Sequence, residues 1–211
     1  MSDPFTRLFH AYGPATDTPA HLRALTGEDD DARAAAVRHL WSAVLHQGTP
    51  WMVTPVVVVE VVEALRHPGV ADPELQVALL EFLAEVATEG TVPTEGRAEL
   101  EGWLAAVPDV EDRLVALSAE GRDDEIYEDP DATGALLAQA ALGCRDALRL
   151  VLPSLAAFSA ATGERADDAV RAALDRTLRA VHEVLTRDHA LDVDRAVAAL
   201  HPVVGSAPTA C

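Results

Sequence analysis

The sequence predicts an all-α protein built as a short right-handed solenoid of antiparallel helical hairpins, and three observations support this. The chain is 49% hydrophobic but only 4% aromatic, and its abundant Ala and Leu are strong helix formers. Apolar residues recur with a 3.6-residue period in several segments. Segment 30–46 carries a single apolar stripe. The next segment, 55–67, is apolar over nearly the whole circumference of the helix that it would form. A helix of the second kind must be covered on several sides, as in stacked hairpins.

The first segments have clear helix boundaries. A short helix is expected over 17–25, followed by an acidic loop at 26–31. That loop places carboxylates in the first turn of the next helix, where the helix dipole favours negative charge. The sequence 47–50, Gln-Gly-Thr-Pro, contains the residues that end helices. We therefore expect a turn between the two helices of the first hairpin.

The segment 55–67 is predicted as a helix with Thr54 as N-cap and Pro55 in the first position. Its Val56–Val59 run has strand propensity. We nonetheless predict helix, because Glu60–Arg66 continue the helical period and no alternating partner strand is visible. No sheet is expected anywhere in the chain.

Further helices are expected along the rest of the chain, at 72–90, 94–107, 108–119, 132–162, 164–187 and 193–200. Pro153 should kink or split the long one. The apolar stripes of the helices expected at 30–46, 72–90 and 132–162 predict that Trp41, Leu79 and Leu137, respectively, are buried. The acidic stretch 120–131 lacks helical periodicity and is expected to be a loop.

The length of 211 residues fits a single domain, which we place at 1–204, with a loose tail at 205–211. The chain start lacks the features of a signal peptide, and no apolar run is long enough to span a membrane. Two cysteines make no disulfide framework. Cys144 is expected as a buried apolar residue. These features favour a cytoplasmic protein.

The net charge of −19 and the absence of lysine indicate which partners are favoured. A negative field repels phosphate, so nucleic-acid binding is not expected. A basic partner is favoured, although acidity also serves solubility. The lack of lysine fits the coding bias of a GC-rich genome better than salt adaptation, because Ala and Arg are both abundant.

Residues 29–41 (DDDARAAAVRHLW), 45–51 (LHQGTPW) and 54–56 (TPV) together resemble the first hairpin of HEAT-repeat-like proteins of the actinobacterial type. The segment Cys144–Pro153 is similar to a later helix of that group. The Thr-Ala-Pro helix start of the family is shortened here, because Val53 directly precedes Thr54-Pro55. The resemblance implies an α-solenoid that serves as a binding scaffold, and it implies no catalytic residue. Hairpins spaced by about forty residues fit the HEAT period.

Five residues are candidates for binding. Trp51 could cap a concave groove with His46 as a polar contact; alternatively, Trp51 plugs the hairpin end and His46 caps its helix. Glu60 and Glu63, with His67, form one stripe that either recognises a cationic ligand or lies in water. Tyr127 is the exception in a stretch otherwise expected to be solvated, because an aromatic residue between acids can pack back or contact a partner.

These observations favour a non-catalytic recognition scaffold that binds a protein or peptide, basic in character, through its concave face. A small-molecule ligand stays open. The alternative is an enzyme of specialised metabolism that uses the groove as a pocket with Glu or His acid–base groups. A weaker alternative is an acidic immunity or inhibitor protein. No cofactor or metal site is expected, because the sequence contains no phosphate loop, dinucleotide fingerprint or zinc-ligand spacing.

Overall fold

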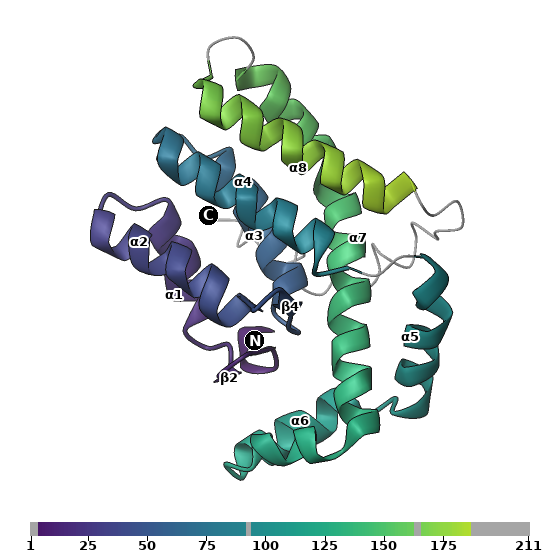
Figure 1. Cartoon of the computed structure of the whole chain (residues 1–211). Coiled ribbons are helices and arrows are strands. Elements are labelled where there is room, and N and C mark those ends of the chain that lie inside the picture. Colours follow the sequence, from purple (N-terminus) through teal and green to yellow (C-terminus); the bar gives the residue numbers. More distant parts are fainter. Residues whose placement is uncertain (1–3, 92–93, 163–165, 187–211) are drawn as a thin grey trace, which may run out of the picture.

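The computed structural model describes residues 4–91, 94–162 and 166–186, and this part of the chain is mostly helical (Figure 1). The all-α class is therefore confirmed. No described helix is long and apolar enough to cross a membrane. The expected helix at 193–200 and the tail at 205–211 lie outside the described residues.

The principal helices are α1 (Thr18–Leu25), α2 (Asp30–His39), α3 (Thr54–Leu65), α4 (Pro73–Thr88), α5 (Thr94–Ala106), α6 (Val110–Ala119), α7 (Pro130–Thr162) and α8 (Asp168–Thr186). Three short helical turns join them: η1 (Pro4–Thr6), η2 (Leu40–Val44), which is π-helical, and η3 (Asp123–Glu128). The Val56–Val59 run is helical, as predicted. Helix α7 continues through Pro153 rather than splitting there.

Side-chain caps explain where two of these helices begin. Asp29 accepts a hydrogen bond from the Ala32 N–H, and Asp72 accepts one from the Glu74 N–H, which satisfies amide groups that have no partner within the helix. The expectation that Thr54 caps α3 is wrong, because Val53 holds that position. The Thr54 hydroxyl instead accepts from the Trp51 N–H at 2.8 Å and donates to the Val44 carbonyl at 2.5 Å.

The expectation that no sheet forms is also wrong, on a small scale. Strands β1 (Phe9–His10) and β2 (Gly13–Pro14) pair antiparallel, as do β3 (Leu45–His46) and β4 (Thr49–Pro50). Gln47 and Gly48 both have positive φ, at 53° and 79°. Two such residues form the tight turn whose twist matches a two-stranded hairpin. The sequence that was expected only to end a helix therefore also reverses the chain.

The core joins helices that are distant in sequence. Helix α4 packs mainly on α8, and both α3 and α5 pack on α7 (Figure 1). Helices α1 and α2 also pack on each other, and α3 makes a smaller contact with α4. Pairs such as α4–α8 go beyond the nearest-neighbour contacts of a simple solenoid. The stacking of consecutive hairpins into a right-handed solenoid thus stays a prediction.

Burial agrees with the predicted stripes at some positions and differs at others. Leu79 and Cys144 are fully buried, as expected. Trp41 is 37% exposed and Leu137 is 36% exposed. Trp41 lies in the π-helical η2, where the altered periodicity turns its side chain out of the α-helical stripe, although its ring still meets Phe82 edge-on. Leu137 lies on the side of α7 that borders a cavity.

The close packing of α3 on α7 predicts an unusual response to a glycine substitution. A Cβ added at Gly143 of α7 would lie 2.8 Å from Cγ of Pro55, a rigid ring in the first turn of α3. Replacing a helical Gly by Ala ordinarily stabilises by about 0.5–1 kcal/mol. We expect Gly143→Ala to destabilise instead, because overpacking costs roughly 1–3 kcal/mol. Denaturant titration measures the change.

Gly102→Ala is the matched control, because Gly102 lies in α5 and a Cβ there has nothing within 4 Å. This variant should gain the ordinary helical stabilisation of up to about 1 kcal/mol. Equal gains from both substitutions would show that α3 and α7 are not as close as described.

Candidate functional site

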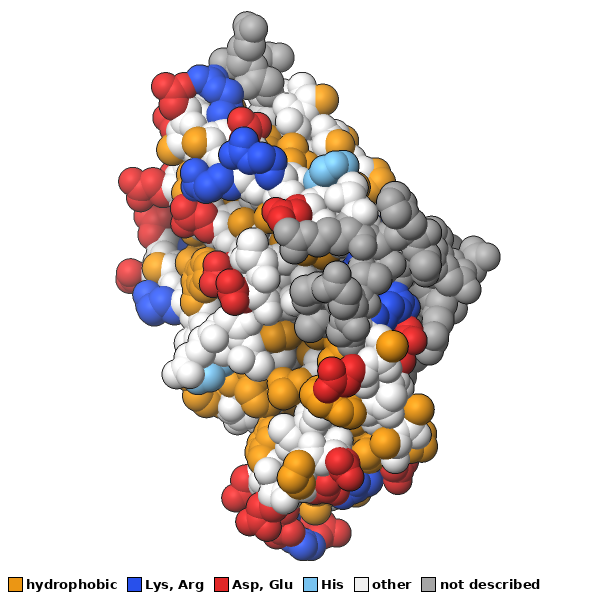
Figure 2. Space-filling view, turned by 45° about the vertical axis from the view of Figure 1, so that its right-hand side comes forward, with side chains coloured by type: hydrophobic (Ala, Val, Ile, Leu, Met, Phe, Trp, Pro, Cys, Tyr) orange, Lys and Arg blue, Asp and Glu red, His pale blue; other side chains and the backbone are white. Residues whose placement is uncertain are grey.

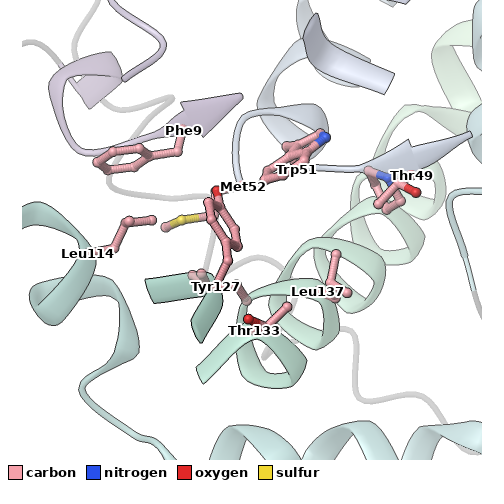
Figure 3. Close-up of a pocket in the computed structure, with 10 residues that line it drawn as sticks. Phe9, Thr49, Trp51, Met52, Leu114, Tyr127, Thr133 and Leu137 are labelled. Atoms are coloured by element: carbon pink, nitrogen blue, oxygen red, sulfur yellow. The ribbon is translucent and has the colours of Figure 1, made fainter. Parts of the chain in front are cut away.

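An apolar cavity of about 210 Å³ lies between the N-terminal segment, the β3–β4 hairpin, α6, η3 and the start of α7 (Figure 3). We call it the aromatic pocket. Its lining residues are Phe9, Thr49, Pro50, Trp51, Met52, Leu114, Tyr127, Thr133, Leu136 and Leu137. None of these carries a carboxylate, an imidazole or a permanent charge. The pocket therefore suits an apolar group rather than an ion.

Trp51 and Tyr127, two of the predicted binding residues, meet in this pocket. Their ring centroids are 6.0 Å apart and their planes lie at 85°, an edge-to-face arrangement that aromatic pairs favour. Trp51 follows directly after β4, and the hydrogen bond from its N–H to the Thr54 hydroxyl fixes its backbone. Tyr127 follows the buried Ile126 in η3 and remains 44% exposed. The pair thus forms an aromatic wall that solvent can reach.

The Tyr127 hydroxyl is neutral at physiological pH. Burial first, and then the negative charge of Asp123, raise the pKa of Tyr127 above its ordinary value. A neutral phenol donates or accepts hydrogen bonds but does not act as a base near pH 7. Tyr127 therefore adds a polar atom to an otherwise apolar site without adding a charge.

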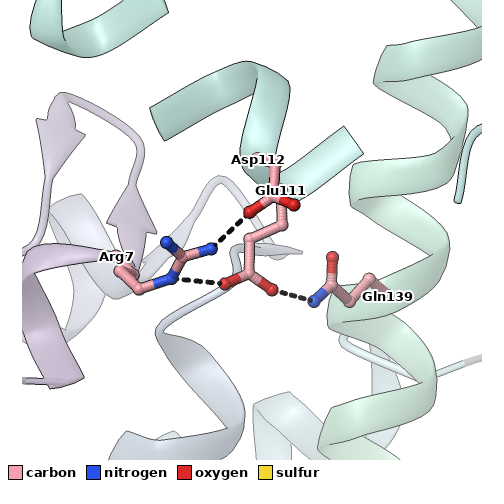
Figure 4. A network of polar contacts seen from close by, with 4 residues as sticks. All are labelled: Arg7, Glu111, Asp112 and Gln139. Carbon is pink, nitrogen blue, oxygen red and sulfur yellow. Dashed lines mark hydrogen bonds and ion pairs between the residues drawn. The ribbon is translucent and has the colours of Figure 1, made fainter. Parts of the chain in front are cut away.

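A polar network ties three of the surrounding segments together (Figure 4). The Arg7 guanidinium donates to Glu111 Oε1 at 3.2 Å and to Asp112 Oδ1 at 2.7 Å. Gln139 of α7 donates to the other oxygen of Glu111 at 3.5 Å. The network links the segment before β1 to α6 and to α7, and β1, α6 and α7 each contribute lining residues to the aromatic pocket. Exposed ion pairs of this kind contribute little stability each, about 0–1 kcal/mol, so their effect is mainly on alignment.

A second, more open hollow adjoins the aromatic pocket. It shares Thr49, Pro50 and Leu137 with the pocket and continues past Leu100 and Ala141 toward Glu89.

On the face shown in Figure 2, hydrophobic side chains form a broad area above an acidic cluster at the lower end of the molecule, where Figure 1 places α6. Apolar surface bordered by charge is typical of interaction sites.

Glu60 and Glu63 line a different hollow from Trp51. This acidic groove, of about 480 Å³, lies between α1 and α3, and Leu22, Arg23 and His67 also line it. Both glutamates are exposed residues, and Glu63 forms an ion pair with Arg66 at 3.0 Å. Burial of the carboxyl group, and then the charge of Glu63, raise the pKa of Glu60. The predicted stripe does border a groove, but the structure separates it from Trp51 and Tyr127.

His46 holds the end of its helix and contacts the β1–β2 hairpin. Its Nδ1 lies 2.8 Å from the Ser42 carbonyl oxygen, which can only accept, so Nδ1 carries the proton and donates. This agrees with the interpretation that His46 caps the preceding helix. Its ring also meets the Tyr12 ring edge-on at 5.6 Å. His46 is not among the lining residues of any of these three hollows.

Sequence reasoning missed a cluster of titratable side chains around His39. Ligand-type atoms of His10, Asp17 and His39 all lie within 4.8 Å of one another. These residues follow no ligand-spacing motif, so only the fold shows that their side chains meet. The spacing alone would admit a divalent cation. However, the Tyr12 N–H donates to His10 Nδ1, so Nε2 must keep its proton rather than bind a metal.

Comparison with known proteins does not extend this description. No protein-family model, curated protein or solved structure matches the chain.

Proposed function

We propose that this protein is a non-catalytic recognition scaffold that binds a protein or peptide partner by accepting one apolar side chain in the aromatic pocket. The observation that carries the proposal is the pocket itself: an accessible apolar hollow walled by Trp51 and Tyr127. Aromatic residues of this type dominate the binding energy of many protein interfaces. The concave-face location and the HEAT-like solenoid remain parts of the hypothesis, supported by the α1–α2 and α3–α4 contacts.

The size of the pocket favours a side chain over a free metabolite. Its volume is about 210 Å³. A cavity of about 150 Å³ can hold a benzene molecule, whereas sites for small molecules are typically about 300–1,000 Å³. The aromatic pocket thus matches one Leu-, Met- or Phe-sized group. The adjoining hollow past Leu137 would accommodate the neighbouring part of the partner.

The chemistry of the lining favours binding over catalysis. General acid–base catalysis needs a group that can exchange a proton near the working pH. The only titratable side chain that lines the aromatic pocket is Tyr127, whose pKa is raised above its ordinary value. The net charge of −19 and the acids of η3 around Tyr127 favour basic residues on either side of the apolar anchor.

Peptide selection tests this proposal without assuming a partner. Peptides would be selected from a random display library on the wild-type protein, and their affinities then measured for Leu137→Asp. Leu137 is exposed at the pocket rim, so an Asp there should spare the fold while placing a charge beside the apolar anchor. We expect selected peptides to share an apolar residue next to basic ones, and to bind Leu137→Asp at least tenfold more weakly.

The double variant Glu60→Gln, Glu63→Gln is the matched comparison, because it alters the acidic groove and leaves the aromatic pocket intact. Selected peptides should bind it with nearly unchanged affinity. If instead the Gln variant loses binding and Leu137→Asp does not, the peptides bind in the acidic groove, and the proposal is contradicted.

The acidic groove supports a second candidate, an enzyme. A carboxyl group with a raised pKa in a groove of about 480 Å³ is the type of group that acts as a general acid. In this alternative Glu60 would protonate a substrate and His67 would be the second polar group. Activity that disappears in Glu60→Gln but persists in Leu137→Asp would favour this candidate. Glu60 is an exposed residue in an open groove, so its carboxyl group is only partly withdrawn from water, which makes it the weaker choice.

A further inference from the structure

The cluster around His39 links three elements near the N-terminus. His10 belongs to β1, Asp17 directly precedes α1, and His39 ends α2. His10 Nε2 lies 2.9 Å from Asp17 Oδ1, and His39 Nδ1 lies 3.9 Å from Asp17 Oδ2. His21 of α1 stacks on the His39 ring with a centroid distance of 4.2 Å. Two imidazoles thus flank one carboxylate, and a third stacks on His39.

The hydrogen bonds assign the protons in this cluster. The Tyr12 N–H donates to His10 Nδ1 at 3.1 Å, so His10 donates from Nε2 to Asp17. Asp17 consequently makes no hydrogen bond to the first turn of its own helix, where an aspartate in that position usually caps. Its carboxylate is directed to the β1–β2 hairpin instead. The cluster therefore fastens the hairpin to α1.

His39 has little capacity to accept a charge. It is only 8% exposed, and its Nε2 lies 2.9 Å from the fully buried Thr18 hydroxyl. The groups that face it are His21 and Asp17 on the α1 side and His10 on the β1 side, where the His10 ring meets it edge-on at 5.4 Å. Asp17 is its only negative neighbour among these, and His10 already bonds that carboxylate. Protonated His39 would therefore be a buried cation between two imidazoles.

The fastened hairpin also forms part of the aromatic pocket. Phe9, next to His10, lines the pocket, and its carbonyl accepts from the Val53 N–H at 3.1 Å. The Ala11 N–H donates to the Ala43 carbonyl at 3.0 Å. These two backbone hydrogen bonds attach the hairpin to η2 and to the start of α3. Release of the hairpin would remove a pocket wall.

We propose that His10, Asp17, His21 and His39 form an acid-sensitive latch, in which protonation of His39 releases the β1–β2 hairpin from α1 and α2. The latch operates on the folded protein and does not depend on the proposed binding function, because its readouts are stability and amide exchange. Release below about pH 6 would open the aromatic pocket on the side of Phe9.

The direction of the pH effect follows from linkage. Burial first, then the charges of His21 and His10, lower the pKa of His39 to about 4, against the opposing effect of Asp17. An unfolded histidine titrates near 6.5, so between these values the unfolded chain binds more protons than the folded one. Stability due to neutral His39 is complete above about pH 6.5 and is lost as the pH falls toward 4.

The test compares wild type with His39→Gln, which keeps a hydrogen-bonding group beside Thr18 but cannot titrate. Acidification from pH 8 to pH 5 should raise the unfolding equilibrium constant of wild type about 30-fold more than that of His39→Gln. His182→Gln, which removes an exposed histidine of α8, should retain the wild-type pH dependence. Hydrogen exchange at the Ala11 amide, corrected for intrinsic pH effects, should accelerate at pH 5 before α8 amides do.

Two results would overturn the latch. In the first, His39→Gln has the same pH dependence of unfolding as wild type. In the second, the Ala11 amide opens only together with α8, which would show that acid unfolds the chain globally rather than releasing the hairpin. Should His39→Gln fold poorly, the His39 ring signals of wild type followed by NMR still decide: titration near pH 6.5 contradicts the proposal, and titration near 4 supports it.

Discussion

Leu79→Ala is expected to destabilise the protein by about 2–5 kcal/mol, the range for large-to-small substitutions in a well-packed core. Leu79 is 0% exposed and belongs to the main core cluster, in which residues of α3, α4, α7 and α8 take part. It lies on α4, which packs principally on α8, and both helices limit how far the cavity can collapse. Urea titration with far-UV circular dichroism measures the loss.

Leu150→Ala supplies the control, since it makes the same chemical change on α7 at a side chain that is 41% exposed. Surface substitutions of this kind usually change stability by less than about 0.5 kcal/mol. A Leu79→Ala loss no larger than that of Leu150→Ala would mean that α4 does not contribute to the core as described.

Trp51→Ala is expected to weaken the affinity of selected peptides at least 30-fold, which corresponds to about 2 kcal/mol. The indole forms one wall of the aromatic pocket and the pair with Tyr127, so its removal eliminates the surface against which an apolar anchor packs. Trp is one of the residue types that are enriched at the energetic centres of interfaces. Isothermal titration calorimetry gives the affinities, and circular dichroism establishes that the variant is folded.

Trp103→Ala distinguishes loss of the pocket from loss of any exposed tryptophan. Trp103 is 41% exposed on α5 and packs near Gly134 of α7, outside the aromatic pocket. Peptide affinity should change by less than about threefold. Comparable losses in Trp51→Ala and Trp103→Ala would indicate nonspecific adhesion of peptides to aromatic surface.

The helices were predictable because their information is local. The Asp72–Pro73 start of α4 and the period of Leu75, Leu79 and Leu83 depend only on neighbouring residues. The pairing of α4 with α8 and of α3 with α7 was not predictable, since the apolar stripe of a helix does not identify the stripe that covers it. The β3–β4 pair was missed for a different reason: its ladder depends on the positive φ angles of Gln47 and Gly48, and the sequence 47–50 was interpreted only as the end of a helix.

In the candidate site, too, individual residues were predictable from the sequence, whereas their contacts in space were not. Trp51 and Tyr127 were recognised as unusual aromatic residues, but their separation in the chain concealed their contact. Trp51 and Glu60 were both predicted as binding residues, but they line different hollows, because residues of α1 form the other side of the groove that contains Glu60. The His39 cluster was missed because residues of three elements create it, and no sequence spacing indicates such a group.

The central claim is that a bound partner places an apolar side chain in the aromatic pocket, and the Met52 methyl group tests it most directly. Met52 is buried in the pocket lining, and the chain contains only one other methionine. With ¹³C-methyl-labelled methionine and a selected peptide, the Met52 signal should shift and show nuclear Overhauser contacts to the apolar anchor, whereas in Leu137→Asp it should remain at its free position. A peptide that binds the wild type while the Met52 methyl signal neither shifts nor contacts it would contradict the account.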